Sequence, residues 1–342
     1  MMAKGARPRI GITMGDAAGV GPEIIAGAWR EPALHQTCSP VVLGHPEILR
    51  RAIAVWKTDT EVVAVDAPEQ ADPSPERMPC IPCAAADVLQ VKPGAIDARA
   101  GQAAYEAVVL AARLASQHRL DAIVTAPLHK EALHLAGHDY PGHTELLAQL
   151  CGVRDFAMML YLGPGEPLRG PAGLAVVHVT LHASLRNALG ALTEEAVLAK
   201  ARLADRFMTR LKGTRAAIGV CALNPHAGEG GLFGSEELAI IRPAVERGLA
   251  EGLCLEGPLP ADTLMVHARD GRFDAVVAMY HDQGHIALKL LGMHRAVNVT
   301  LGLPILRTSV AHGTAFDLAW QARAQTSGLL EAVRLAARLA RQ

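Results

Sequence analysis

Short apolar runs alternate with longer amphipathic stretches along most of the chain, which predicts repeated strand and helix units. Strands are predicted over residues 8–14, 40–44, 61–66, 121–125, 156–162, 174–180, 216–221 and 275–280. Helices are predicted over residues 22–29, 101–117, 145–150, 193–212, 235–247 and 327–341, with another ending near residue 54. This order is typical of a mostly parallel sheet with right-handed crossovers. Residues 67–98, rich in Pro and Ala, lack the pattern and are expected to form a surface excursion.

Composition supports an α/β class and excludes several functions. Half of the 342 residues are hydrophobic but only 4% are aromatic, as in parallel sheets covered on both faces. With 33 basic and 34 acidic residues, the chain has no broad basic field for nucleic acid or a membrane surface. No apolar run approaches the ~20 residues of a membrane span. The N-terminus has no apolar signal core, so a cytoplasmic enzyme is expected.

The six cysteines are scattered, and only Cys80 and Cys83 are close in sequence. A lone pair with this spacing lacks the second pair that a structural zinc site needs. All six are therefore expected to be ordinary thiols in a reducing compartment.

A polar cluster from His281 to His285 follows the strand predicted to end at residue 280. In open α/β sheets, ligands bind outside the carboxyl ends of the strands. Lys289, Asn298 and Arg307 follow at even intervals and supply donors suited to an anion. The alternative is that the two histidines are solvated loop residues.

Three strands each deliver a histidine where they end: His182, His226 and His281. Because parallel strands point their carboxyl ends to one side, the three imidazoles could converge on a divalent metal and leave a coordination position open. His226 lies in the glycine-rich segment 224–231, where a backbone can approach a ligand closely. Taken singly, each is more often a polar loop residue. His178 is expected to be a core histidine.

Two turns from strand to helix have the composition of ligand-binding loops. Residues 15–22 contain three glycines but match neither the GxGxxG nor the GxxxxGKS phosphate-binding pattern. His143 and Thr144 begin a predicted helix, where backbone amides and hydroxyls favour anions. Asp262 and Asp282 are candidate partners for imidazoles, although capping and turn roles remain open for both.

These motifs together resemble the 4-hydroxythreonine-4-phosphate dehydrogenase family of vitamin B6 biosynthesis and its close paralogues. The resemblance covers nearly the whole chain. It is carried by ITMGDAAGVGPE (12–23), TAPLHK (125–130), PGHTE (141–145), NPHAGEGG (224–231), GPLPADT (257–263), MYHDQGH (279–285) and VNVTLGLPILRTSVAHGTA (297–315).

The resemblance implies the fold of isocitrate and isopropylmalate dehydrogenases, with two α/β/α lobes and an active cleft between them. The lobes are expected at 1–130 plus 300–342, on the cofactor side, and at 131–299, with the metal site and the dimer interface. That fold binds NAD or NADP without a Rossmann fingerprint. The family pattern places a zinc, magnesium or cobalt ion on the same three histidines. It places substrate contacts on His143, Thr144, Lys289, Asn298 and Arg307, and the adenosine half of the cofactor against His312, Gly313 and Thr314.

The expected reaction is oxidation of a secondary alcohol, then decarboxylation, in a homodimer whose active site lies at the subunit interface. His182, His226, His281, Lys289 and Asp262 are the candidate catalytic residues. The substrate is expected to be a small phosphorylated anion, first 4-hydroxythreonine-4-phosphate. Alternatives are 4-phospho-D-threonate or erythronate and a terephthalate cis-dihydrodiol. More distant ones are a metal-dependent hydrolase and a two-lobed binding protein.

Two features depart from the family pattern. Ala17 stands where the family often has proline, and the loop 163–173 is longer than expected and could reshape the substrate mouth.

Overall fold

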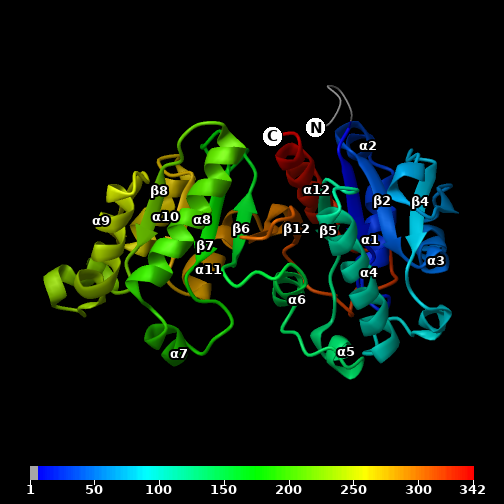
Figure 1. Cartoon of the computed structure of the whole chain (residues 1–342), viewed down its shortest axis with the longest axis horizontal. Coiled ribbons are helices and arrows are strands. Elements are labelled where there is room, and N and C mark those ends of the chain that lie inside the picture. The colour runs from blue at the N-terminus through cyan, green and yellow to red at the C-terminus, as the bar shows by residue number, and fades with distance from the viewer. Residues whose placement is uncertain (1–6) are drawn as a thin grey trace. The chain divides into compact units, whose positions relative to one another are not determined.

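The computed structural model describes residues 7–342 and divides the chain into two compact units (Figure 1). Unit 1 runs to Arg154 and resumes at Leu303–Gln342, and unit 2 is Asp155–Gly302. Within the described residues, no helix is long and apolar enough to cross a membrane.

Unit 1 contains a parallel sheet in the order β3-β4-β2-β1-β5-β12. Its strands are β1 (Arg9–Thr13), β2 (Ser39–Gly44), β3 (Glu61–Ala64), β4 (Arg77–Pro82), β5 (Ala122–Thr125) and β12 (Arg307–Val310). Because all six run the same way, the loops after β1, β5 and β12 leave the sheet at one edge.

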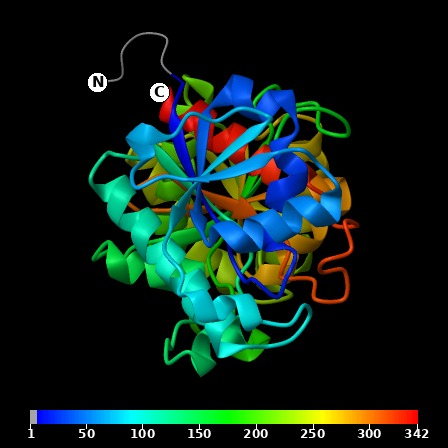
Figure 2. The ribbon, with the colours of Figure 1, turned by 90° about the vertical axis from the view of Figure 1, so that its right-hand side faces the viewer.

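Helices cover both faces of this sheet, as the apolar strands require. Figure 2 shows α1 and α3 on one side of the strands and α4 on the other. The helices of unit 1 are α1 (Gly21–Trp29), α2 (Pro32–Thr37), α3 (Pro46–Trp56), α4 (Ala98–Ser116), α5 (Lys130–Leu135), α6 (His143–Leu150) and α12 (Ser327–Ala340).

Unit 2 contains a mixed sheet in the order β11-β6-β7-β10-β8-β9, in which β6 runs antiparallel to both neighbours. Its strands are β6 (Ala157–Leu162), β7 (Leu174–His178), β8 (Ile218–Cys221), β9 (Leu255–Leu259), β10 (Ala275–Ala278) and β11 (Val297–Leu301). The neighbours β7, β10 and β8 are parallel, so the segments that follow them share an edge.

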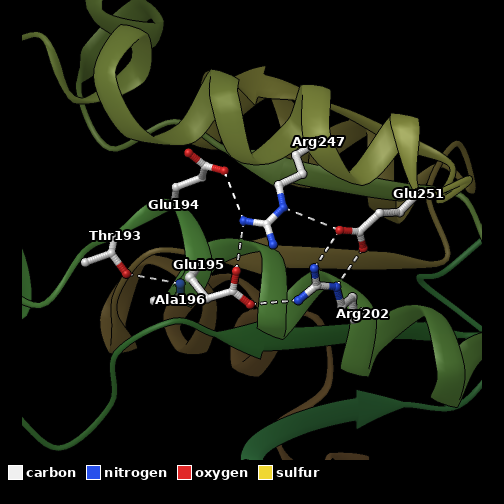
Figure 3. Close-up of polar contacts among 7 residues, drawn as sticks. All are labelled: Thr193, Glu194, Glu195, Ala196, Arg202, Arg247 and Glu251. Atoms are coloured by element: carbon white, nitrogen blue, oxygen red, sulfur yellow. Dashed lines mark hydrogen bonds and ion pairs between the residues drawn. The ribbon is translucent and has the colours of Figure 1, made fainter.

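In unit 2, α8 and α9 pack on one face of the sheet, whereas α10 and α11 pack on the other. The helices are α7 (Leu185–Gly190), α8 (Glu194–Lys212), α9 (Arg242–Ala250), α10 (Ala261–Arg269) and α11 (His281–Gly292). Arg202 and Arg247 alternate with Glu194, Glu195 and Glu251 in an ion-pair network between α8 and α9 (Figure 3).

The expected α/β class with mostly parallel strands is confirmed. Two expectations differ from the structure. Residues 77–82, within the expected excursion, form β4 and lie between β3 and β2 in the sheet. Residues 131–154, expected in the central lobe, belong to unit 1, because α6 buries Leu146 and Leu147 in the same core as α4.

Candidate active site

The first turn of α11 is held to the ends of two strands by the side chain of Gln283. Gln283 Oε1 accepts a hydrogen bond from the backbone amide of Met279, at 2.7 Å. Gln283 Nε2 donates to the carbonyl of Ala222, just after β8, also at 2.7 Å. The predicted polar cluster is therefore the N-terminus of a helix and not a solvated loop, and His281 is its first residue.

His182 and His281 line one pocket of about 410 Å³. The loop after β7 runs beside the end of β10, because the Thr180 hydroxyl donates to the Met279 carbonyl at 2.9 Å. This brings the two imidazole rings to a centroid distance of 6.2 Å. Asp282 Oδ1 lies 2.6 Å from His281 Nδ1, a contact that orients the ring and leaves Nε2 for another partner.

His226 lies in a loop with an uncommon backbone. His226, Ala227 and Glu229 have φ angles of 54°, 53° and 45°, in the left-handed region that side-chain-bearing residues seldom adopt. Gly228 and Gly230 share this conformation.

Glu237, which the sequence interpretation missed, holds this loop. Its Oε1 accepts hydrogen bonds from the amides of Leu223 (2.8 Å) and Asn224 (2.7 Å), and its Oε2 accepts one from Asn224 Nδ2 at 2.9 Å. Burial raises the pKa of Glu237, but these hydrogen bonds outweigh it and the net effect is a lowered pKa.

The three predicted metal ligands fit a divalent ion in donor chemistry. Imidazole nitrogens suit zinc and similar ions, and Asp282 supplies the carboxylate that commonly orients a ligating histidine. Residues 7–342 nevertheless contain no group of three or more His, Cys, Asp or Glu side chains arranged around one metal position. The chain brings together His182 and His281, and the joint site with His226 stays a prediction.

Two more histidines lie beneath His281. His178 is 1% exposed and His285 is 6% exposed. The rings of His281 and His285 are stacked, with centroids 3.8 Å apart, and His285 Nδ1 lies 3.0 Å from His178 Nε2. Burial first, and then neighbouring histidine charges, hold the pKa of His178 well below its usual range and lower that of His285 to about 4. The expectation that His178 is buried is confirmed.

Unit 1 holds a buried cationic group. The guanidinium of Arg307, on β12, donates from Nη2 (2.6 Å) and Nε (3.2 Å) to Thr125 Oγ1 at the end of β5. Burial lowers the pKa of Arg307 to about 9, partly offset by the charge of Glu145, so the side chain is still a cation at neutral pH.

His143, the first residue of α6, belongs to the same neighbourhood as Arg307. Its Nε2 is buried and has no hydrogen-bond partner. Burial, and then the positive charge of Arg307, hold its pKa well below the usual range, so the ring is neutral. Thr144 follows it at the helix start.

The remaining predicted contacts lie in unit 2. Lys289 lies on α11, and Asn298, on β11, has a buried Oδ1 without a hydrogen-bond partner. Asp262 is exposed in the first turn of α10 and accepts a hydrogen bond from the amide of Thr263 at 2.8 Å, and its catalytic role stays a prediction.

The expected cofactor segment of unit 1 contacts the loop after β1. The Thr314 carbonyl accepts a hydrogen bond from Val20 at 3.0 Å, and a Cβ on Gly19 would come within 2.9 Å of Thr314 Cβ. His312 Nδ1 lies 2.9 Å from the Gly313 carbonyl. In that loop, burial raises the pKa of Asp16 to about 6, and its Oδ2 has no hydrogen-bond partner. The cofactor role of residues 312–314 stays a prediction.

Residues 36–336 match the family described as pyridoxal phosphate biosynthetic protein PdxA. The chain belongs to the PdxA family. It is 46% identical over 332 residues to a D-threonate 4-phosphate dehydrogenase of Pectobacterium atrosepticum, covering 97% of this chain and 99% of that one. It is 45% identical over 335 residues to a 4-hydroxythreonine-4-phosphate dehydrogenase of Geobacter metallireducens, covering 98% and 96%.

Solved structures agree with this assignment to the PdxA family. A 4-hydroxythreonine-4-phosphate dehydrogenase from Klebsiella pneumoniae matches with a TM-score of 0.86 and 45% identity, covering 97% of this chain and 99% of that one. A terephthalate 1,2-cis-dihydrodiol dehydrogenase from Burkholderia xenovorans matches with a TM-score of 0.65 and 31% identity, covering 97% and 98%. The resemblance seen in the sequence motifs is thereby confirmed.

Proposed function

We propose that this oxidoreductase of the PdxA family oxidises the 3-hydroxyl of a phosphorylated four-carbon hydroxy acid with NAD or NADP and releases CO₂. The buried Arg307 guanidinium, next to the unpartnered Nε2 of neutral His143, is the observation that carries the proposal. A buried arginine fork recognises phosphate or carboxylate oxygens with good geometry. Relatives of similar identity are named for two such phosphorylated acids.

The two candidate substrates differ only at C2. D-threonate 4-phosphate, named for the Pectobacterium relative, carries a hydroxyl there. 4-Hydroxythreonine-4-phosphate, named for the Geobacter relative, carries an amino group. Oxidation at C3 gives a β-keto acid in both cases, and loss of CO₂ leaves a phosphorylated three-carbon ketone with a hydroxyl or an amino group. Arg307 and His143 would recognise the part that both substrates share.

The chain's own residues bind and orient in this reaction. Arg307 binds an anionic group of the substrate, and His143 Nε2 adds a hydrogen bond to it. Lys289 and Asn298 are proposed as further substrate contacts. Asp282 keeps the ring of His281 in one orientation. A divalent ion held by His182, His226 and His281 would polarise the hydroxyl oxygen and stabilise the charge that develops on it, and a nicotinamide cofactor against residues 312–314 would accept the hydride.

The test is a panel of substrates in the presence of NAD or NADP and added divalent metals, followed by absorbance at 340 nm. The proposal expects NADH or NADPH formation, with one CO₂ released per turnover, for D-threonate 4-phosphate or 4-hydroxythreonine-4-phosphate. Oxidation of a terephthalate cis-dihydrodiol alone would assign the protein to that paralogue. Metal-dependent hydrolysis without cofactor reduction would replace the proposal by the hydrolase alternative.

We also propose that the enzyme is a homodimer with active sites at the subunit interface. Unit 2 exposes large apolar side chains near the predicted metal histidines, as surfaces that mark protein interfaces do. They lie on α7, in the segment after the glycine-rich loop, on α11 and directly after it: Leu185, Leu189, Leu232, Phe233, Leu238, Ile286, Leu290 and Met293. All six cysteines are free, in keeping with a proposed cytoplasmic location.

Subunit exchange tests the shared site. His226→Ala and His281→Ala variants, each inactive alone, are mixed and allowed to exchange. If the two histidines serve one site from different chains, heterodimers regain activity towards half of wild type. A failure to regain activity after verified exchange would place all ligands in one chain, and a monomer at assay concentration would overturn the dimer.

A further inference from the structure

His178 and His285 form a buried hydrogen-bonded pair that the proposed reaction does not use. His178 ends β7, and His285 is the fifth residue of α11. Their facing nitrogens are 3.0 Å apart and their ring centroids 4.5 Å apart. In a neutral pair, one ring donates and the other accepts, so the bond fixes the rotation of both rings.

His285 also supports the predicted metal ligand. It stands four positions after His281, so the two side chains lie on the same face of α11. Their rings are stacked with centroids 3.8 Å apart and planes inclined by 12°. With Asp282 at its Nδ1 edge and His285 against its face, the His281 ring is held from two directions.

Gly284, between His281 and His285 in the sequence, makes this arrangement possible. A Cβ on Gly284 would come within 2.5 Å of both His178 Nε2 and Val176 Cγ1. Only glycine therefore allows α11 to approach β7 closely enough for the His178–His285 hydrogen bond. Gln283 ties the same turn to the backbone at Met279 and Ala222.

We propose that His178 and His285 are positioning residues: their hydrogen bond locks the His285 ring, which in turn holds the His281 imidazole ready to bind a divalent ion. This inference rests on the proposed function in taking His281 as a metal ligand. On this proposal, each residue of the segment 282–285 helps to hold the His281 ring in place. Two apolar side chains would fill the same space without the cost of burying polar nitrogens, so packing alone does not explain a histidine pair.

The experiment measures metal affinity, with no substrate or cofactor present. Co²⁺ and Zn²⁺ are titrated into the metal-stripped full-length protein in competition with a chromophoric chelator, and the Co²⁺ visible spectrum reports ligand geometry. His178→Gln places an amide near the position of Nε2 and retains the hydrogen bond, whereas His178→Leu is apolar and removes it. His134→Leu, at an exposed position on α5, is the matched control.

Residues that hold a metal-ligating histidine in place typically contribute 10–100-fold to metal affinity. We therefore expect His178→Leu to weaken binding about 10- to 100-fold and alter the Co²⁺ spectrum, with most of the affinity restored in His178→Gln. A role in packing alone predicts the reverse order, because Leu suits a buried apolar site better than Gln. His285→Phe gives a second comparison: it keeps a stacked ring but loses the bond, so we expect weakened binding.

The controls separate this inference from the proposed function. If His281→Ala binds metal as tightly as wild type, the metal assignment itself is wrong. If His281→Ala weakens binding but His178→Leu and His285→Phe do not, the metal assignment survives and the positioning role is overturned. Circular dichroism and the thermal midpoint verify folding, and if His178→Leu does not fold, His285→Phe alone decides the matter.

Discussion

Replacing Arg307 with methionine is expected to lower activity strongly while changing stability little. Methionine has a similar length but no charge, and it cannot bind an anionic group of the substrate. Loss of a hydrogen bond to a charged group costs about 1.5–3 kcal/mol, equivalent to a roughly 10- to 150-fold rise in KM for the phosphorylated substrate. The KM for NAD should change far less, because the expected cofactor contacts lie elsewhere.

The effect on stability follows from the burial of the Arg307 cation. Burial lowers its pKa from 12.5 to about 9, and such a change corresponds to about 5 kcal/mol against the charged form. Methionine removes that penalty, but it also removes the two hydrogen bonds from the charged guanidinium to Thr125, each of which contributes about 1.5–3 kcal/mol. The two effects nearly cancel, so we expect the free energy of unfolding in the absence of ligand to change by no more than about 2 kcal/mol.

Urea unfolding and initial rates at 340 nm measure the two quantities on the same preparations. Arg272→Met is the control, because Arg272 is exposed and pairs with Glu256 at the surface. It should change neither value appreciably. A methionine variant at 307 that loses most of its stability while keeping its KM would refute the reasoning on both counts, and the anion site would have to lie elsewhere.

Four further predictions concern other parts of the chain. Asp16 holds its proton up to about pH 6 when folded, so its contribution to stability is complete below pH 3.8 and is lost as pH rises through 6. Asp16→Asn should therefore gain about 3 kcal/mol relative to wild type between pH 4 and pH 8, as urea unfolding would reveal, and a pH-independent difference would contradict this. Gly284→Ala forces a methyl group against His178, so it should lower the free energy of unfolding by about 1–3 kcal/mol and weaken Co²⁺ binding. An unchanged free energy of unfolding and an unchanged Co²⁺ affinity would exclude close packing at this position. Arg202→Met removes partly exposed ion pairs (Figure 3), so it should lower the free energy of unfolding by no more than about 1 kcal/mol, and this difference should vanish in 1 M salt. Removal of divalent ions with a chelator should abolish turnover, restored by added metal, and full activity in a metal-free preparation would exclude a metal role.

The sequence predicted the main helices and strands closely, because strong periodicity reflects burial directly. The helix expected at 193–212 is α8 (Glu194–Lys212), and the strand expected at 121–125 is β5 (Ala122–Thr125). β4 was missed because it contains Pro79 and Pro82, and proline cannot donate to a sheet. Its core contribution comes from Met78 and Cys80, both fully buried, in a segment too short and too proline-rich to show alternation.

The sequence suggested candidate site residues where the chemistry is carried by the residue type. Histidines at the ends of predicted parallel strands indicated a metal site, and the donors Lys289, Asn298 and Arg307 indicated an anion, and both stay predictions. Residues that act on other residues gave no such signal. Glu237 reaches across more than ten positions to hold the His226 loop, and His178 meets His285 only because β7 and α11 pack together. Such pairings depend on tertiary contacts, which cannot be read from local patterns in one sequence.

The left-handed run at residues 226–230 has a consequence for the timing of ligand binding. A side-chain-bearing residue in this conformation costs roughly 1–2 kcal/mol, and three occur in the run. Segments with solvent-exposed backbone hydrogen bonds and few buried residues open locally before the rest of a domain does, and of this run only Gly228 is buried. Amide hydrogen exchange in this loop should therefore be among the fastest in unit 2, and it should slow sharply on addition of metal if His226 is a ligand as proposed. Metal uptake would then be limited by how often the opened loop returns to its left-handed form. Glycine adopts this conformation without the cost that alanine carries. Ala227→Gly should therefore change the association rate of the ion more than its final occupancy.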